Sequence, residues 1–127
     1  MAYLIDTHVF LWMARYPEKL SERARGIVLR PERVLLLLSS ASVHELAIKI
    51  ASGKLAVPYS LPDIAKALDV SIDAFDGLAA NQYIADQAVQ HKDPFDRAIA
   101  AHAKRLAVPL ISADSAFACF PDLQVIW

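Results

Sequence analysis

The chain has almost no cysteine and little glycine. Cys119 is the one cysteine among 127 residues, and glycine occurs only three times. A lone cysteine excludes an intramolecular disulfide framework and a metal site built on cysteine pairs. We therefore expect Cys119 to be a buried thiol and the chain to reside in the reducing cytoplasm. Because there is also no Ser/Gly-rich or Pro-rich tract, we expect no linker, and residues 1–127 should form one domain.

Long apolar runs are also missing. Hydrophobic residues make up 56% of the chain and the mean hydropathy is +0.33, yet no run approaches the roughly 20 residues of a membrane span. The N-terminal residues lack a basic start and are interrupted by Asp6, so a signal peptide is not expected. A domain of this size cannot easily hide so much apolar surface. This predicts that a partner or a second copy covers part of it.

A strong excess of charge of one sign is absent as well. The net charge is −1, from 13 basic and 14 acidic residues. The overall field therefore does not favour a polyanionic partner, and any chemistry on phosphates has to come from a local site.

Strand and helix patterns alternate along the chain. Strands are expected at Tyr3–Ile5, Val34–Leu38, Val70–Ile72, Pro109–Ser112 and Gln124–Trp127. Helices are expected at Thr7–Ala14, Ser21–Arg30, Ser42–Ser52, Leu61–Asp69, Leu78–Val89 and Phe95–Leu106, with a helical turn at Asp114–Phe117. The continuous apolar run of the second strand is typical of a strand that is buried on both faces. The alternation predicts an α/β fold with a mainly parallel sheet.

Four carboxylates stand where such a sheet binds its ligands, outside the carboxyl ends of the strands. Asp6 follows the first strand directly, and Glu45 lies in the first turns of the helix after the second strand. Asp96 lies in the first turn of the helix that precedes a late strand, and Asp114 comes two residues after that strand.

Each acid could instead serve its own helix. Asp6 and Asp114 could cap the helical segments that follow them, and Ser42 with Glu45 has the spacing of a capping box. Asp93 before Pro94 is a good N-cap, which would place Asp96 in a favourable first turn. However, Ser, Thr and Asn cap helices equally well. An acid at all four positions therefore favours a shared chemical role.

Converging carboxylates would repel one another and raise their pKa values unless a cation neutralises them. Oxygen ligands suit Mg²⁺ or Mn²⁺ rather than zinc, and no His or Cys pair has zinc spacing. Such an ion, held by few protein ligands, can polarise a phosphoryl oxygen and activate an attacking water. It would also let an acidic crevice accept phosphate. The residues therefore predict metal-dependent phosphoryl chemistry.

Four segments resemble the motifs of a known family. They are DTHVFLW at 6–12, SASVHELAIKIASGKL at 40–55, HKDPFDRAIAAHA at 91–103 and LISADSAF at 110–117. In this order and spacing they resemble PIN-domain ribonucleases, in particular the VapC-type toxins of prokaryotic toxin–antitoxin pairs. The resemblance spans nearly the whole chain. His44 stands where this branch commonly has Trp, and Ser112 where it commonly has Thr, but neither departure removes a carboxylate.

The resemblance implies a PIN-like three-layer α/β sandwich, with a mainly parallel central sheet flanked by helices. It also implies a Mg²⁺- or Mn²⁺-dependent endoribonuclease that leaves a 5′-phosphate and a 3′-hydroxyl. The catalytic acids would be Asp6, Glu45, Asp96 and Asp114, and the metal ligands among them Asp6, Asp96 and Asp114. Thr7 and Ser112 would support the acids, and Asp93 would cap or support. The implied partners are an RNA substrate, a second copy in a homodimer, and a cognate antitoxin whose tail covers the acidic site.

Two other functions compete with this interpretation. A phosphoacceptor module of receiver type shares the size and the α/β pattern, but it requires paired acids after the first strand and a Lys after a late strand. Neither Asp6 nor the segment 110–114 supplies them. A catalytically silent binding subunit with a PIN fold is the second alternative, against which the intact acids argue.

Two further polar residues have simpler structural interpretations. His102 falls on the apolar stripe of its predicted helix and is expected to be a satisfied, semi-buried imidazole. Lys49 lies one turn beyond Glu45, which predicts an i,i+4 ion pair on the helix surface.

Overall fold

The computed structural model describes residues 1–30 and 34–127, in which five strands form one sheet. The strands are β1 (Ala2–Ile5), β2 (Leu35–Ser39), β3 (Val70–Asp73), β4 (Leu110–Ile111) and β5 (Val125–Ile126). Their order is β3-β2-β1-β4-β5, and each neighbouring pair is parallel. The expected parallel sheet is thus confirmed.

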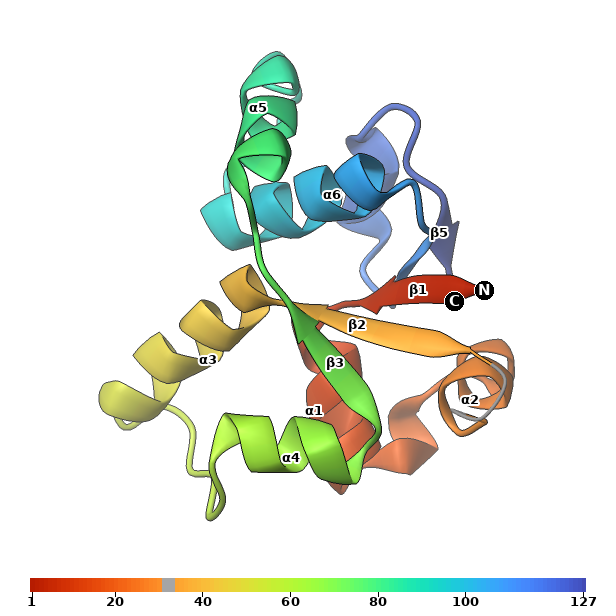
Figure 1. Ribbon diagram of the computed structural model, residues 1–127, viewed down its shortest axis with the longest axis vertical. Coiled ribbons are helices and arrows are strands. Elements are labelled where there is room, and N and C mark those ends of the chain that lie inside the picture. Colours follow the sequence, from red (N-terminus) through yellow and green to blue (C-terminus); the bar gives the residue numbers. More distant parts are fainter. Residues whose placement is uncertain (31–33) are drawn as a thin grey trace.

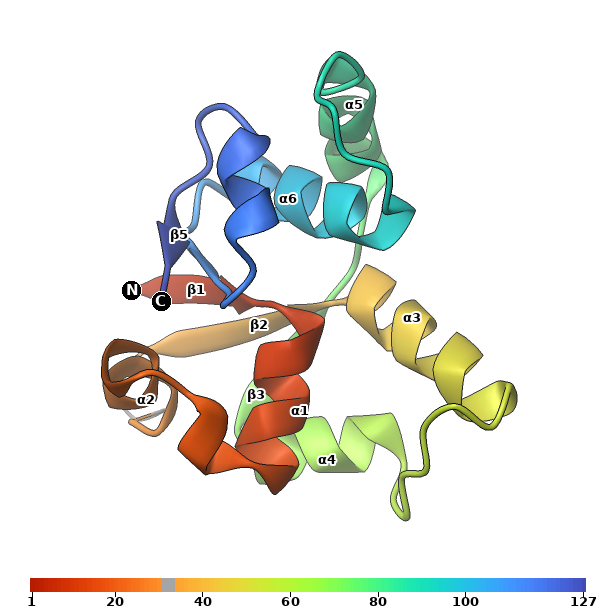
Figure 2. The same ribbon diagram turned by 180° about the vertical axis from the view of Figure 1, so that it is seen from behind.

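Helices cover both faces of this sheet (Figures 1 and 2). They are α1 (Thr7–Arg15), α2 (Glu22–Val28), α3 (Ser40–Ala51), α4 (Leu61–Ala67), α5 (Gly77–Ala85) and α6 (Pro94–Leu106), with 3-10 turns η1 (Pro17–Lys19) and η3 (Ser115–Cys119). Helices α1, α2 and α4 lie on one side, and α6 with η3 on the other, while α5 stands on α6. This is the expected three-layer sandwich. No helix within the described ranges is long and apolar enough to cross a membrane.

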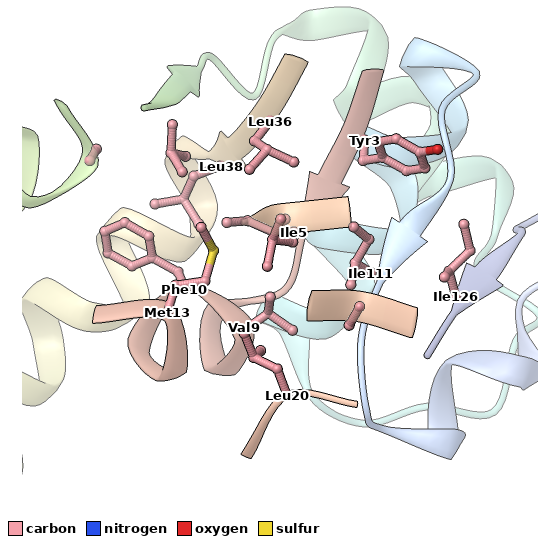
Figure 3. Packing of buried hydrophobic residues seen from close by; sticks show 14 of the residues in the cluster. Tyr3, Ile5, Val9, Phe10, Met13, Leu20, Leu36, Leu38, Ile111 and Ile126 are labelled. Atoms are coloured by element: carbon pink, nitrogen blue, oxygen red, sulfur yellow. The ribbon is translucent and has the colours of Figure 1, made fainter. Parts of the chain in front are cut away.

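Alternating strand residues build two apolar layers, one on each face of the sheet. Ile5, Leu36 and Leu38 point into the layer that also holds Phe10 and other residues of α1 (Figure 3). Leu37 belongs to the second layer, with side chains from α6 and η3. Each such fully buried side chain contributes about 1.5–3 kcal/mol to stability relative to an exposed one. The expectation that the second strand is buried on both faces is confirmed.

Helix α3 begins before the expected Ser42, and the alternative of a capping box formed by Ser42 and Glu45 does not hold. The helix begins at Ser40, and its N-cap is Ser39, whose Oγ accepts a hydrogen bond from the Ala41 N–H at 3.1 Å. Ser42 is fully buried inside the helix and does not cap it. The prediction was wrong because several serines stand close together here, and only packing against the rest of the chain selects the first helical residue.

The prediction for Cys119 was also wrong, because its thiol is exposed. In the segment around η3, Phe117 and Phe120 occupy the core positions, and Cys119 points outward between them. Helix α5 also ends at Ala85, short of the expected Val89. The three residues after it form turns rather than helix.

Candidate active site

The carboxyl ends of parallel strands meet at one edge of the sheet, and the candidate acids gather there. Asp6 follows β1, and its backbone N–H donates to the Ile111 carbonyl of β4 at 3.0 Å. Helix α3 starts directly at the end of β2 and carries Glu45. Helix α6 runs against the strand direction (Figure 1), so its first turn, with Asp96, returns to the same edge.

Asp6 is held from the neighbouring strand. The residue is only 4% exposed, and Ser112 Oγ donates to its Oδ2 at 2.8 Å. Although Asp6 occupies the N-cap position of α1, its side chain makes no capping hydrogen bond. Burial raises the pKa of Asp6, even though the Ser112 hydrogen bond acts in the opposite direction. The carboxylate is thus buried without serving as a helix cap.

Glu45 is held on both sides. Thr7 Oγ1 lies 2.8 Å from its Oε1 and 2.9 Å from Ser42 Oγ. Because a carboxylate only accepts, the Thr7 proton goes to Glu45 and the Ser42 hydroxyl donates to Thr7. Lys49 Nζ lies 3.3 Å from Oε2 of Glu45, which confirms the expected i,i+4 pair. The charge of Glu45 in turn contributes to raising the pKa of Asp6.

Asp96 pairs with a histidine from the preceding loop. His91 Nε2 lies 3.1 Å from its Oδ2, and the two side chains are 14% and 19% exposed. Burial raises the pKa of Asp96 to about 6; the His91 hydrogen bond lowers it, and the charges of Asp93 and Asp6 add to the rise. Asp93 itself caps α6, accepting from the N–H groups of Phe95 at 2.8 Å and Asp96 at 3.2 Å.

Asp114 stands at the margin of this group. It is exposed, and its Oδ1 accepts from the Ala116 N–H at 2.9 Å, which caps η3. Its connection to the other acids runs through its backbone N–H, which donates to Ser112 Oγ at 3.0 Å. The structure therefore couples Asp6, Glu45 and Asp96 electrostatically and links Asp114 to them through Ser112.

The donor set fits a hard cation chemically. The side chains of Asp6, Glu45, Asp96 and Asp114 offer only oxygen, which Mg²⁺ and Mn²⁺ prefer. Within the described ranges no Lys or Arg forms an ion pair with Asp6 or Asp96. In the same part of the chain, no three His, Cys, Asp or Glu side chains are grouped so that they could hold one ion. A small number of direct protein ligands is usual for Mg²⁺, which keeps several waters.

Sequence reasoning missed His91 as a member of this site. Its ring stacks on Phe117 with centroids 6.3 Å apart, and its centroid lies 5.5 Å from that of the Phe120 ring, so aromatic residues of η3 and its C-cap orient it toward Asp96. The loop between His91 and α6 determines this contact, and no periodic pattern describes a loop. The one available signal was the position of His91 within the segment HKDPFD.

A second polar cluster joins α6 to the ends of β2 and β3. His102 of α6 is 1% exposed; its Nδ1 is 2.8 Å from Ser39 Oγ and its Nε2 is 2.8 Å from Asp73 Oδ2. The expectation of a satisfied imidazole is confirmed, and the ring is more deeply buried than expected.

The comparisons with known proteins agree with this architecture. The family model of the PIN domain matches residues 3–122. The chain is similar in structure to DNA-bound VapBC from Salmonella typhimurium, with a TM-score of 0.73 and 22% identity over 99% of this chain and 97% of that chain. For VapBC2 from Rickettsia felis, bound to a promoter DNA fragment, the TM-score is 0.72 and the identity 17%, over 99% and 98%. For FitAcB from Neisseria gonorrhoeae the TM-score is 0.65 and the identity 23%, over 98% of this chain and 96% of that chain. Curated protein sequences give no match.

Proposed function

The chain belongs to the PIN-domain family, whose model matches residues 3–122, and from this premise we propose that it is a metal-dependent endoribonuclease of the VapC toxin type. One observation carries the proposal. Asp6 and Asp96 come from different elements to one edge of the sheet, both have raised pKa values, and neither has a Lys or Arg partner among the described residues. A site for a hard cation explains why such carboxylates are placed together.

Asp6, Asp96 and Asp114 are the residues that would hold a Mg²⁺ or Mn²⁺ ion. When bound, such an ion polarises a phosphoryl oxygen and makes an attacking water more acidic. Ser112 holds the Asp6 carboxylate in place through Oδ2, and His91 does the same for Asp96. Both hydrogen bonds go to Oδ2, so Oδ1 of each carboxylate does not take part in them.

Glu45 is the group that orients the attacking water. Thr7 and Lys49 fix its carboxylate from two sides. The carboxylate that accepts the water proton is therefore already oriented. In the proposed reaction, the water oxygen bonds to phosphorus as its proton passes to Glu45, the bond from phosphorus to the 3′ oxygen breaks, and the leaving 3′ oxygen takes a proton from solvent water. The products are a 5′-phosphate and a 3′-hydroxyl, as the resemblance to PIN-domain ribonucleases implies.

We further propose a cognate antitoxin and a second copy of the chain as partners in the cytoplasm. The similar solved structures include toxin–antitoxin complexes, such as one from Klebsiella pneumoniae. An apolar groove of about 390 Å³ lies between α1 and α4, with Phe10, Leu11, Ile64 and Leu68 among its lining residues. Co-expression with the product of an adjacent short gene, followed by measurement of the mass of the complex, tests both partners.

The nuclease assignment is tested with Asp6→Asn and Asp96→Asn. Asn keeps an oxygen that accepts from Ser112 or His91, so both variants should fold as the wild type does by circular dichroism. Both should lose Mn²⁺-dependent RNA cleavage by about 100-fold or more, which is typical when a group that stabilises transition-state charge is removed. Asp93→Asn on the same helix is the matched control, because it keeps the α6 cap and should keep the activity.

Full activity in both Asp6→Asn and Asp96→Asn would refute the catalytic assignment. A folded wild type that neither binds Mn²⁺ in calorimetry nor cleaves RNA would instead indicate a catalytically silent PIN-fold binding subunit.

A further inference from the structure

A chain of hydrogen bonds joins α6 to the ends of β2 and β3, and we call it the His102 bridge. It consists of Ser39, His102 and Asp73, with 2.8 Å from Ser39 Oγ to Nδ1 and 2.8 Å from Nε2 to Asp73 Oδ2. Ser39 and His102 are 0% and 1% exposed, respectively. None of the three belongs to the acidic site described above.

The protons of the bridge follow from the chemistry of its groups. An ionised Asp73 only accepts, so Nε2 of His102 carries a hydrogen and donates it. In the neutral ring Nδ1 then accepts, and its donor is the Ser39 hydroxyl. A lone pair of Ser39 Oγ remains for the N–H of Ala41, which it caps at 3.1 Å. His102 therefore sets the orientation of the hydroxyl that starts α3.

The order Ser, His, Asp is also that of a hydrolase triad, but it cannot work as one here. A nucleophilic hydroxyl has to meet its substrate, and Ser39 is fully buried beneath the first turn of α3. The bridge thus has the chemistry of a structural tie. Its importance depends on which elements it ties together.

Those elements carry two of the candidate acids. Ser39 stands six residues before Glu45 of α3, and His102 stands six residues after Asp96 of α6. No hydrogen bond between the described residues joins Glu45 to Asp96 directly, so their separation depends on how α3 and α6 are held. Besides the bridge, the His44 ring meets the Phe95 ring edge-on, with centroids 5.8 Å apart. That contact is partly exposed, whereas Ser39 and His102 of the bridge are buried.

We propose that His102 is a positioning residue, which fixes the start of α3 against α6 and thereby the distance between Glu45 and Asp96. The proposal rests on the proposed nuclease function, because only a site that uses both carboxylates gains from a fixed distance between them. It goes beyond that function in assigning a role to a residue that touches neither metal nor RNA.

Two substitutions at the same position separate the two ends of the bridge. In His102→Gln the side-chain amide reaches the place of Nε2 and keeps the Asp73 contact, but loses the Ser39 contact. In His102→Asn the amide lies near the place of Nδ1 and keeps the Ser39 contact. Ile99→Val is the control, because Ile99 is fully buried on the same helix and loses packing without touching the bridge.

The readouts are the Kd for Mn²⁺ from calorimetry and the hydrogen exchange of the Ala41 amide in the metal-free protein. His102→Gln should weaken Mn²⁺ binding severalfold, because a shift of α6 moves the proposed ligand Asp96 relative to Asp6, and should speed up exchange at Ala41. His102→Asn and Ile99→Val should change both values less than His102→Gln does. If His102→Gln does not fold, Asp73→Ala takes its place, because it removes the half-exposed partner of His102 Nε2. Both readouts should then shift in the same direction as expected for His102→Gln, by a smaller factor.

Unchanged Mn²⁺ affinity and unchanged Ala41 exchange in His102→Gln, or in Asp73→Ala where that variant replaces it, would overturn the proposal. So would an affinity that falls equally in Ile99→Val, because the effect would then come from lost packing. If the wild type itself neither binds Mn²⁺ nor cleaves RNA, the proposed function fails and the positioning role fails with it. The Ala41 exchange still shows in that case whether His102 fixes the start of α3.

Discussion

Single residues at the candidate site carry negative charge that the protein itself does little to neutralise. The carboxylate of Asp6 is buried and accepts one side-chain hydrogen bond, from Ser112. Asp96 has a histidine partner, and its pKa is nevertheless raised to about 6. Since the cost of ionising these groups appears in both stability and ligand binding, it can be measured without any assay of cleavage.

The hydroxyl of Ser112 is the first such residue to test. Ser112→Ala removes the donor to Asp6, so the pKa of Asp6 should rise further and Mn²⁺ binding at pH 7 should weaken about tenfold. Ser112→Thr keeps the hydroxyl and should bind Mn²⁺ like the wild type. Calorimetric titration of the three proteins with Mn²⁺ tests this prediction. Equal Mn²⁺ affinity of Ser112→Ala and wild type would contradict it.

Asp96 should make the metal-free protein less stable at neutral pH. Its folded pKa of about 6 lies above the usual aspartate value of 3.8, so between these two pH values the folded state binds more protons than the unfolded state. The contribution of Asp96 to stability is therefore lost as pH rises through about 6. Asp96→Asn should be more stable than wild type by about 1–2 kcal/mol at pH 7, allowing for solvent screening.

At pH 4 or below this difference should vanish, because Asp96 is then protonated in the folded protein. Urea unfolding of both proteins at the two pH values in the presence of EDTA measures it. A wild type that is the more stable of the two at pH 7 would show that Asp96 is not under electrostatic strain.

At the scale of elements, α6 is the helix that brings most to the site. Its N-terminus carries Asp96, its middle carries His102, and its cap is the doubly hydrogen-bonded Asp93. Asp93→Ala should lower the free energy of unfolding by about 1 kcal/mol, whereas Asp93→Asn should leave it almost unchanged. Urea denaturation compares them, and equal losses in both variants would argue against a capping role.

Helices α5 and α6 are joined by buried charges. Lys104 Nζ lies 2.7 Å from Asp86 Oδ1, both side chains are less than 10% exposed, and Asp86 Oδ2 has no hydrogen-bond partner among the described residues. Lys104→Met would leave the Asp86 charge buried and alone, which should cost about 3–5 kcal/mol.

The double variant Lys104→Met/Asp86→Leu should recover much of that loss, because it removes both charges. Thermal unfolding of the single and double variants tests this. A double variant no more stable than Lys104→Met would show that lost packing, not the unpaired charge, causes the loss.

The elements differ in how well the sequence predicts them. Alternate burial of Leu36, Leu37 and Leu38 follows from a continuous apolar run, because a strand with two covered faces has no polar side. The start of α3 could not be chosen in the same way. Ser39 and Ser42 are both acceptable caps in isolation, and the choice depends on His102 and Thr7, which arrive from distant parts of the chain.

The same distinction applies to the site. That Asp6 and Asp114 follow strands can be read from local patterns, and a parallel sheet then places them at one edge. The contact of His91 with Asp96 depends on the conformation of a loop and on the position of the Phe117 ring. No local sequence pattern therefore predicts it.

For the whole molecule, a bound divalent ion should act as a stabiliser whose effect depends on pH. An ion that binds only the folded state raises stability by about 2.7 kcal/mol at 100 times its Kd, which shifts Tm by about 10 °C in a domain of this size. Because protons compete for Asp96 below about pH 6, the shift from a fixed Mn²⁺ concentration should be larger at pH 7.5 than at pH 5.5. Differential scanning calorimetry of wild type measures it.

The variant Asp6→Asn/Asp96→Asn should show no Mn²⁺-dependent shift at either pH. An equal shift in this variant would mean that the ion binds elsewhere.

The hydrogen bond between Ser112 and Asp6 joins residues that are 106 positions apart. A ribosome synthesises Asp6 well before Ser112, at about 5–20 residues per second. Throughout that interval β1 lacks its neighbour β4, and the carboxylate of Asp6 lacks its donor. A nascent chain therefore carries an incomplete acidic site until β4 and Ser112 emerge, so any nuclease activity begins only after that strand has been translated.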